Sequence, residues 1–501
     1  MGKKSVLLMF VAGVITVLGF APFHAPPVPF ITLALLFWQW SQAATPRIAF
    51  NDGWWFGLGF FLAGVSWIYV SLHTFGAMPM PLAASATLLF CAFLGLFPAL
   101  TGYAVVRSGC SMTVKLLLLA PALWAMSEWI RSWIFTGFPW NSIGYSQIPG
   151  SPLAGFAPVL GVYGVSLIVA VMAGAVALIA ARRGEARKTH RAAIAGFVAL
   201  GMTGYALKHI EWTQPAGAPV SVSLLQGNVA QDMKWREDQM RATLKTYAKM
   251  ISQSDARLIV LPETALPLFL HQVPPDYMDA IAAHAKRSNG DVLIGVPERN
   301  PDGSYFNTTF SLGASPQQYY RKSHLVPFGE FIPLRPVLAW IVNILAIPLQ
   351  DFSRGAVDQR PLDVAGQKVA VNICYEDVFG EEIIRQLPQA TLLVNMSNVA
   401  WFGRSIAPEQ HLQISQARAL ETGRYMLRAT NTGMTAVVNP RGVVEKVAPQ
   451  FESAILTHSV RGYAGVTPYV RWGNYALLLL MVLMLLVAWR MPRSEASPKS
   501  L

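Results

Sequence analysis

The chain has 501 residues, of which 53% are hydrophobic and only 13% are charged, and this composition favours a membrane protein over a single soluble domain. The net charge is +12, yet residues 218–458 contain 22 basic and 22 acidic residues, so the whole excess lies outside that range. A nucleic-acid-binding protein would carry its basic excess on the polar part of the chain, so the charge distribution excludes that class and favours membrane topology as its cause.

Eight apolar segments predict a bundle of about eight transmembrane helices. They are residues 5–20, about 28–43, 53–72, 82–106, 114–134, 159–181, 192–208 and, near the C-terminus, Asn474–Trp489. Each comes near the ~20 residues that a bilayer requires, although the first, second and last are short. Lys3 and Lys4 before the first segment are typical of a signal peptide as well, but no clean Ala-x-Ala site follows, so we expect a retained helix.

The distribution of lysine and arginine residues along the chain predicts the orientation of these segments. With the N-terminus in the cytoplasm, the large basic cluster at 182–191 lies inside, and the segment 209–473 faces outward. We expect seven helices in residues 1–208, a linker at 209–217, a catalytic domain at 218–458, a linker at 459–473, the eighth helix at 474–489 and a cytoplasmic tail at 490–501. In a Gram-negative bacterium this is a multi-pass inner-membrane protein whose catalytic domain is periplasmic.

Two charged residues lie inside the predicted membrane part. Glu128 and Arg131 are three positions apart near the end of the fifth segment, on one helix face. We favour a mutually neutralising pair at the membrane interface, and the alternative is a contact with a lipid headgroup.

The polar part alternates short apolar strands with helices. Expected strands are 220–226, 257–261, 291–296, 306–312, 318–322, 369–374, 391–395, 427–429 and 435–438, and expected helices are 236–252, 277–287 and 408–423. This order, with a hairpin at 306–322, indicates an α/β layered sandwich.

An almost wholly apolar run, 336–349, interrupts the polar part and is too short to span a bilayer. One interpretation is additional core. The other, which we prefer in a membrane-bound chain, is an arm that dips into the outer leaflet beside the active site.

Three reactive side chains each follow a short strand: Glu263 after Leu258–Leu261, Lys322 after residues 318–321, and Cys374 after 369–373. A thiolate is a strong nucleophile, a carboxylate can take the thiol proton, and a lysine can stabilise the thiolate and an oxyanion. Taken alone, Cys374 also fits a small buried core residue.

Further groups near these positions fit supporting roles. The backbone N–H of Tyr375 could be a second oxyanion donor, and Glu330 or Glu376 could orient Lys322, relay a proton, or form an ordinary salt bridge. The histidines lack metal-ligand spacing, so we expect no metal and no cofactor.

The chain contains, in order, the motifs Leu-Pro-Glu-Thr, Lys-x-x-Leu-Val-Pro-Phe-Gly-Glu-Phe and Ile-Cys-Tyr-Glu. These motifs carry a resemblance to the nitrilase (carbon–nitrogen hydrolase) superfamily over about residues 218–455. That resemblance implies an αββα sandwich with Glu263, Lys322 and Cys374 as a catalytic triad. With about eight transmembrane helices and Gln226-Gly227-Asn228, the whole chain resembles the apolipoprotein N-acyltransferase family.

The second resemblance implies a ping-pong reaction. A phospholipid, typically phosphatidylethanolamine, donates an acyl chain to Cys374, and the acyl group passes to the α-amine of a diacylglyceryl-cysteine at an apolipoprotein N-terminus. It also implies that Trp235, Glu330, Tyr375 and Glu376 belong to the substrate pocket. The alternatives are a membrane-tethered amidase, which transfers the acyl group to water, and a transporter with an appended binding domain. The few charges in the membrane segments speak against the transporter.

Overall fold

The structure, a computed structural model, describes residues 3–182, 187–231, 234, 236–333 and 352–491. The chain divides into two compact units. The helical unit comprises Met1–Tyr69, Met80–Ile210 and Trp472–Leu501, and the sandwich unit comprises Val70–Pro79 and Glu211–Arg471.

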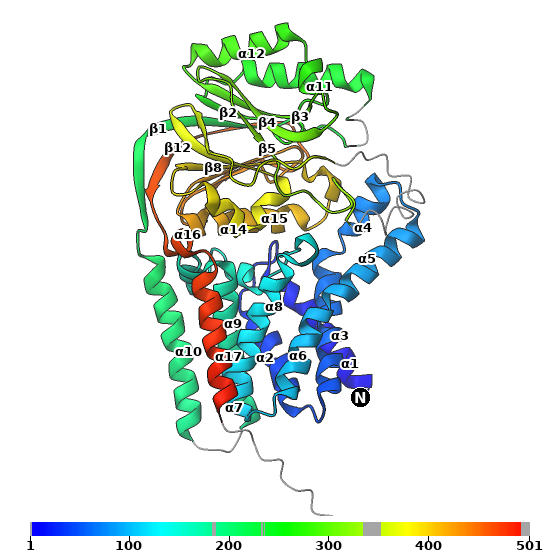
Figure 1. The fold of residues 1–501 in the computed structure, drawn as a ribbon, viewed down its shortest axis with the longest axis vertical. Coiled ribbons are helices and arrows are strands. Elements are labelled where there is room, and N and C mark those ends of the chain that lie inside the picture. Colours follow the sequence, from blue (N-terminus) through cyan, green and yellow to red (C-terminus); the bar gives the residue numbers. More distant parts are fainter. Residues whose placement is uncertain (1–2, 183–186, 232–233, 235, 334–351, 492–501) are drawn as a thin grey trace, which may run out of the picture. The chain divides into compact units, whose positions relative to one another are not determined.

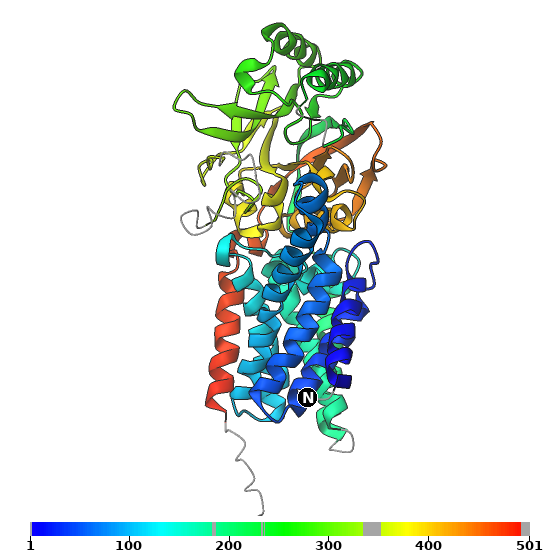
Figure 2. The same ribbon diagram turned by 90° about the vertical axis from the view of Figure 1, so that its right-hand side faces the viewer.

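The helical unit contains long helices that run side by side in both ribbon views (Figures 1 and 2). The main ones are α1 (Lys3–Thr16), α2 (Pro27–Gln42), α3 (Pro46–Val65), α5 (Met80–Leu94), α6 (Leu96–Arg107), α8 (Ala120–Arg131), α9 (Ala157–Ala181), α10 (Arg187–Lys208) and α17 (Tyr475–Arg490). Each apolar segment predicted from the sequence overlaps one or two of these helices.

Length and composition allow fewer membrane spans than the eight predicted. Among the described helices, Met80–Arg107, Met112–Arg131 and Pro152–Ala181 are long and apolar enough to cross a membrane. Pro46–Val65 and Ile68–Phe75, bent by 56° at their junction, make a fourth if they form one span. The predicted number is therefore not confirmed, because α1, α2 and α17 have only 14, 16 and 16 residues and α10 begins with a basic turn.

Glu128 and Arg131 are both buried within the helical unit, at 4% and 3% exposure. Glu128 accepts hydrogen bonds from Trp124 Nε1 and the N–H of Ile143, at 2.9 Å each. Arg131 donates to the carbonyls of Phe138 and Trp140 and to a serine hydroxyl. The two side chains therefore fix the segment after α8 through protein partners, and neither is placed to contact a lipid headgroup.

The sandwich unit consists of two six-stranded sheets, which Figure 1 shows stacked face to face between helices. The first sheet has the order β12-β1-β2-β3-β4-β5 and the second has the order β11-β10-β9-β8-β7-β6. The central strands of both sheets are parallel, as expected for strands buried on both faces.

Nine of the strands overlap the predicted apolar runs, and β6, β11 and β12 were not predicted. The strands are β1 (Thr213–Gln226), β2 (Leu258–Val260), β3 (Asp291–Arg299), β4 (Tyr305–Gly313), β5 (Tyr319–Arg321), β6 (Leu362–Val364), β7 (Gln367–Ile373), β8 (Leu392–Ser397), β9 (Met426–Thr430), β10 (Ala436–Val438), β11 (Val444–Val447) and β12 (Ala454–Gly465). The helices are α11 (Glu237–Ser252), α12 (Pro275–Arg287), α14 (Gly380–Ile383) and α15 (Ala407–Thr422).

Three apolar layers hold this unit together. Alternate residues of the two sheets, including Val222, Val260, Val371 and Val394, fill the space between them. The outer face of the first sheet packs against α11 and α12, and the outer face of the second sheet packs against α14 and α15. The order helix, sheet, sheet, helix is the αββα sandwich that the resemblance implied.

Three features differ from the sequence prediction. β1 begins at Thr213, inside the range expected to be a linker, and β12 continues past 458 to Gly465. Thr213 pairs with Gly465, so the chain enters and leaves the sandwich at one edge. Residues 70–79, expected to end a transmembrane helix and begin a loop, pack with the sandwich: Ser71 Oγ donates to the Trp401 carbonyl at 2.8 Å, and Phe75 contacts the Trp401 ring edge-on.

Candidate active site

Glu263, Lys322 and Cys374 lie just past the carboxyl ends of β2, β5 and β7. The turn that bears Glu263 crosses β3 closely at Gly295. A side chain at Gly295 would place its Cβ 2.2 Å from the Pro262 carbonyl oxygen, so only glycine permits this crossing. The apolar strands thus position the polar groups at their ends, as the sequence predicted.

The lysine lies between two carboxylates. Lys322 Nζ is 2.9 Å from Glu330 Oε1 and 3.5 Å from Glu263 Oε1, and its side chain is 1% exposed. Asn307, on β4, donates its side-chain N–H groups to both acids, at 2.7 Å to Glu263 and 3.2 Å to Glu330. The N–H of Asn398, just after β8, donates to the other oxygen of Glu263 at 2.9 Å. Residues from both sheets therefore fix Glu263.

The charge state of Lys322 follows from these partners. Burial alone would lower its pKa, but Glu330 and Glu263 outweigh burial and raise the pKa above the ordinary lysine value. The lysine therefore stays positively charged throughout the physiological pH range.

Cys374 sits on a sharp turn between a strand and a short helix. Its φ is +54°, a conformation that L-residues rarely adopt, and a 3₁₀ turn follows at Cys374–Val378. The side chain is partly exposed. Surrounding protein atoms and Glu263 raise the pKa of the thiol, and Lys322 opposes this rise. The resting group is therefore a neutral thiol, which needs a base when it reacts.

Glu376 joins the lysine segment to the cysteine strand. One carboxylate oxygen accepts from the N–H and hydroxyl of Ser323, at 2.7 and 3.0 Å, and from the N–H of His324 at 3.0 Å. The other accepts from the Ile373 N–H at 2.7 Å, and Tyr320 Oη lies 3.0 Å from both oxygens. Burial raises the pKa of Glu376, and its backbone hydrogen bonds oppose that rise. These contacts identify Glu376 as a positioning group, and none of them is a salt bridge to Lys322.

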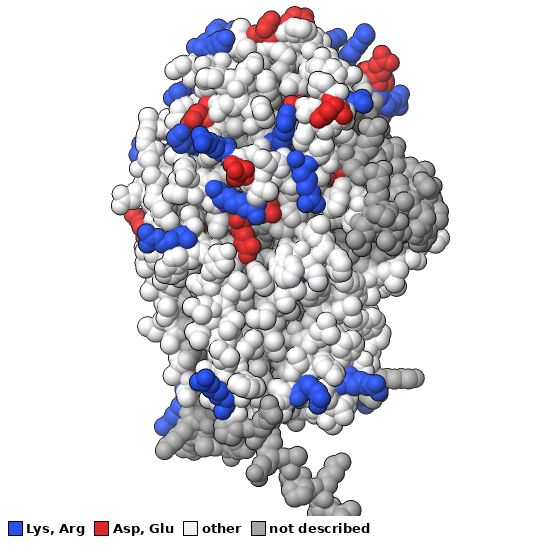
Figure 3. All heavy atoms as spheres, in the orientation of Figure 1, with Lys and Arg blue, Asp and Glu red and all other residues white. Residues whose placement is uncertain are grey.

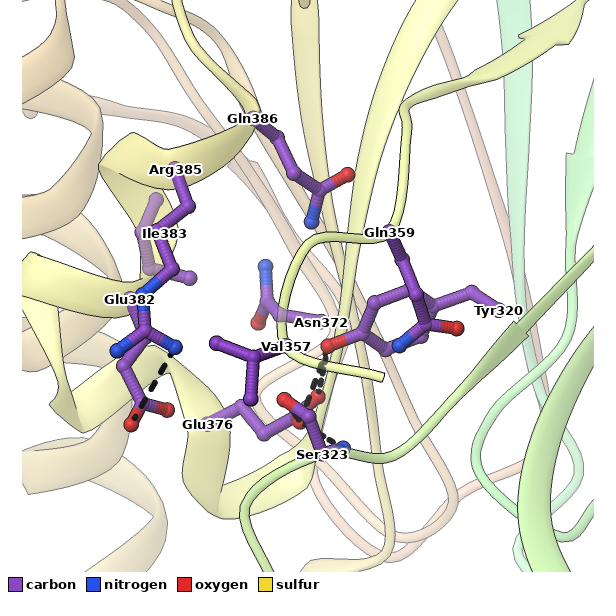
Figure 4. A pocket seen from close by; sticks show the side chains of 10 residues that line it. All are labelled: Tyr320, Ser323, Val357, Gln359, Asn372, Glu376, Glu382, Ile383, Arg385 and Gln386. Atoms are coloured by element: carbon purple, nitrogen blue, oxygen red, sulfur yellow. Dashed lines mark hydrogen bonds and ion pairs between the residues drawn. The ribbon is translucent and has the colours of Figure 1, made fainter. Parts of the chain in front are cut away.

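A small polar pocket lies behind Glu376, and Figure 4 shows the side chains that line it. They are Tyr320, Ser323, Val357, Gln359, Asn372, Glu376, Glu382, Ile383, Arg385 and Gln386. Because none of the three candidate catalytic side chains lines this pocket, it is not the site where the reacting groups would meet. The ring of Tyr375, the residue after Cys374, packs against the ring of Phe379 with the centroids 5.1 Å apart, and Tyr375 does not line this pocket.

The sequence prediction missed several polar residues at the site. Asn307 and Asn398 hold Glu263, and Lys234 is buried at 3% exposure. Burial lowers the pKa of Lys234 to about 8, although Glu263 acts to raise it. A lone asparagine in a strand or a lysine in a turn gives no sequence signal, because either is usually solvated.

Two sequence-predicted features cannot be placed. Trp235 and the apolar run 336–349 lie outside the described residues. Among the residues that the structure does describe, no group of three His, Cys, Asp or Glu side chains is arranged to hold a metal ion.

Comparison with known proteins assigns the class of this fold and site. The family model for carbon–nitrogen hydrolases matches residues 221–469, and the model for the apolipoprotein N-acyltransferase N-terminal domain matches residues 12–175. The sandwich unit is thus a carbon–nitrogen hydrolase domain.

Relatives of similar length match nearly the whole chain. Apolipoprotein N-acyltransferase from Nitrosomonas europaea is 55% identical over 97% of this chain and 97% of its own length. Proteins of the same name from Chromobacterium violaceum and Methylococcus capsulatus are each 45% identical, over 96% and 99% of this chain and 93% and 97% of their own lengths. The chain belongs to the apolipoprotein N-acyltransferase family.

Similar solved structures include a carbon–nitrogen hydrolase from Helicobacter pylori G27 and an amidase from Nesterenkonia sp. They share 16% and 18% sequence identity with this chain, each with a TM-score of 0.37, and each comparison covers 52% of this chain and 95% of the other.

Proposed function

We propose that this enzyme transfers a fatty acyl chain from a phospholipid to the N-terminal α-amine of the diacylglyceryl-cysteine of apolipoproteins, through a thioester on Cys374. Family membership supports the reaction class. The single observation that carries the chemistry is the cluster of Glu263, Lys322 and Glu330, whose charges act on the Cys374 thiol.

The first half-reaction forms the thioester. Glu263 takes the thiol proton as Cys374 Sγ bonds to the ester carbonyl carbon. Lys322 and the backbone N–H of Tyr375 stabilise the oxyanion. The ester C–O bond then breaks, and the proton on Glu263 passes to the departing oxygen, which releases a lysophospholipid.

The second half-reaction uses the same groups in reverse. The neutral lipoprotein amine attacks the thioester carbonyl, and Glu263 takes a proton from the nitrogen. The C–S bond breaks as the proton on Glu263 returns to the sulfur. The products are an N-acylated lipoprotein and the free thiol, so the cycle consumes no other reactant.

Supporting residues act by position. Glu330 holds Lys322 at 2.9 Å and takes no part in the proton transfers of Glu263. Glu376 ties Ser323 and His324 to Ile373 and so sets the separation of lysine and cysteine.

We place the protein in the bacterial inner membrane with the sandwich unit in the periplasm. The lysine and arginine pattern of the sequence supports this orientation. On the visible face of the helical unit, Figure 3 shows basic residues gathered at one end, next to a broad band of uncharged residues. The expected donor is a phospholipid of that membrane, with phosphatidylethanolamine as our choice.

The test is the intact mass of the purified full-length protein after incubation with phosphatidylethanolamine in detergent. We expect a fatty-acyl adduct that maps to the Cys374 peptide. Adding a diacylated lipopeptide should move the acyl group to the amine of the lipopeptide. Cys374→Ser should abolish this transfer, and Cys110→Ser, a change at a cysteine of the helical unit, should leave it intact.

Two outcomes would reject the proposal. Transfer at the wild-type rate by Cys374→Ser would remove the cysteine from its role. Release of free fatty acid at the same rate with and without lipopeptide, with no acylated peptide, would make the protein a hydrolase that transfers the acyl group to water.

A further inference from the structure

A buried cluster of charged and polar side chains lies behind Cys374 and has no part in the mechanism above. It consists of Asp377, Asn395, His411, Ser415 and Arg428, and none of them is more than 1% exposed. Buried charges are costly and are rare without a partner or a function, so this cluster requires an explanation.

The guanidinium of Arg428 is the centre of the cluster. Its Nη1 donates to Asn395 Oδ1 at 2.7 Å, to Ser415 Oγ at 3.0 Å and to Asp377 Oδ2 at 3.2 Å. Asp377 Oδ1 accepts from His411 Nε2 at 2.6 Å. Burial lowers the pKa of His411, so this contact is a hydrogen bond from a neutral imidazole, and the charges in the cluster are those of Arg428 and Asp377.

Asn395 connects Arg428 to the Cys374 turn. Asn395 receives the arginine N–H on its oxygen and donates its own N–H groups to the Cys374 carbonyl at 3.0 Å and to Asn372 Oδ1 at 2.7 Å. The Cys374 carbonyl thus has a fixed partner where the backbone is in its strained left-handed conformation, with φ of +54°. Asn372 also lines the polar pocket that Figure 4 shows.

The hydrogen-bonding capacity of Arg428 is not fully used in this cluster. Within the part of the chain that the structure describes, Arg428 Nε and Nη2 are buried without a hydrogen-bond partner. A purely structural site would satisfy those donors or use apolar side chains. The positive charge of Arg428 instead acts on the Cys374 thiol, together with Lys322, and against Glu263 and Glu330.

We propose that Arg428 is a positioning residue for the nucleophile, which it serves in two ways: through Asn395 it fixes the Cys374 turn, and its buried charge favours the thiolate. This inference rests on the proposed role of Cys374 and adds a second cation, on the side of the second sheet, to Lys322. It also gives the partly unsatisfied guanidinium a function.

The experiment measures how fast iodoacetamide alkylates Cys374 in the full-length protein, with peptide mass spectrometry to separate Cys374 from Cys91 and Cys110. At a fixed pH below the thiol pKa, the rate follows the thiolate fraction. Arg428→Gln removes the charge and keeps a hydrogen-bonding group. It should slow alkylation about tenfold, which corresponds to a rise of about one unit in the pKa of the Cys374 thiol. Arg428→Lys keeps the charge and should stay within about twofold of the wild-type alkylation rate, because one ammonium can donate to the acceptors that Nη1 contacts.

The matched control is Arg424→Gln. Arg424 is equally buried, but among the described residues its partners are backbone carbonyls, such as those of Ala390 and Gly465, so its loss should leave alkylation of Cys374 unchanged. If Arg428→Gln does not fold, Asp377→Asn is the alternative test. Removing the carboxylate that partners Arg428 should speed the alkylation of Cys374.

The inference would be overturned if Cys374 in Arg428→Gln were alkylated at the wild-type rate. Where that variant does not fold, the wild-type rate in Asp377→Asn would overturn it. These readouts need no acyl transfer. A failure of the proposed reaction would show as no acyl adduct on wild-type protein, while a failure of this inference would show as unchanged thiol reactivity in the variants.

Discussion

Glu376→Gln tests whether the lysine and cysteine segments depend on one buried carboxylate. Gln keeps the shape of Glu376 but replaces one acceptor oxygen with an NH₂ group. In one orientation that NH₂ meets the Ile373 N–H, and in the other it meets the N–H groups of Ser323 and His324. Both orientations therefore leave at least one buried backbone N–H without an acceptor.

The magnitude follows from the contacts. A hydrogen bond to a charged group contributes about 1.5–3 kcal/mol, and a donor left unsatisfied costs a similar amount. Tyr320 can reorient its hydroxyl to accept from the new NH₂, so only the backbone contact is lost in the better orientation. We expect a loss of about 2–3 kcal/mol, which lowers Tm by roughly 4–12 °C for a domain of this size.

The assay pairs thermal unfolding in detergent with the rate of acyl-enzyme formation. We expect Tm to fall and the acylation rate to drop further than stability alone explains, because Ile373 immediately precedes the nucleophile. Glu298→Gln is the control, since Glu298 pairs with Arg321 at 2.6 Å, next to Lys322, without contacting the cysteine strand. Glu376→Gln with wild-type Tm and rate would refute the reasoning.

Two further predictions concern the other buried charges. Lys234→Met should raise Tm at pH 7. The pKa of Lys234 is about 8 in the folded protein and 10.5 in the unfolded chain, so the unfolded chain binds the proton more tightly. This difference destabilises the folded protein by about 3 kcal/mol. The free-energy cost of the buried charge is full below pH 8 and falls between pH 8 and 10.5. The difference in Tm between the variant and the wild type should therefore shrink over that range in thermal unfolding scans. Equal Tm values at pH 7 would contradict this prediction. Glu330→Gln should lower the pKa of Lys322 by removing the carboxylate at 2.9 Å, and should slow acyl-enzyme formation by about a hundredfold or more in a single-turnover assay. An unchanged rate would show that Glu263 alone positions the lysine.

The sequence predicts the sandwich well because its central strands are short, apolar and β-branched. β7 was expected at 369–374 and is found at Gln367–Ile373, and α15 was expected at 408–423 and is found at Ala407–Thr422. Local pattern suffices there, since burial on both faces leaves no room for polar residues.

The misses are elements that depend on distant partners. The first residues of β1 are polar or small and become a strand by pairing with β12 across the whole domain. Residues 70–79 read as the end of a transmembrane helix, but they pack against Trp401, more than three hundred residues away. Tertiary contacts of this kind leave no local periodicity.

Site residues divide in the same way. Glu263, Lys322 and Cys374 follow recognisable strands, and strand ends place groups at one edge of a sheet. Asn307 and Arg428 lie inside strands, where one polar residue has no motif. Only the structure shows that Asn307 donates to Glu263 and that Arg428 donates to Asn395, which in turn donates to the Cys374 carbonyl.

The arrangement of charge explains how one site can support both half-reactions. At rest, Lys322 is held by Glu330 and Glu263, so two carboxylates face one ammonium and the thiol stays protonated. In the proposed mechanism, Glu263 loses its own charge when it takes the thiol proton, and the ammonium of Lys322 then faces one carboxylate fewer. The charge of the lysine then becomes available at the moment when the oxyanion forms. Return of the proton to the leaving group restores the first state. In this proposal, proton transfer and oxyanion stabilisation are therefore one electrostatic event, and Glu330 keeps Lys322 in place while it occurs.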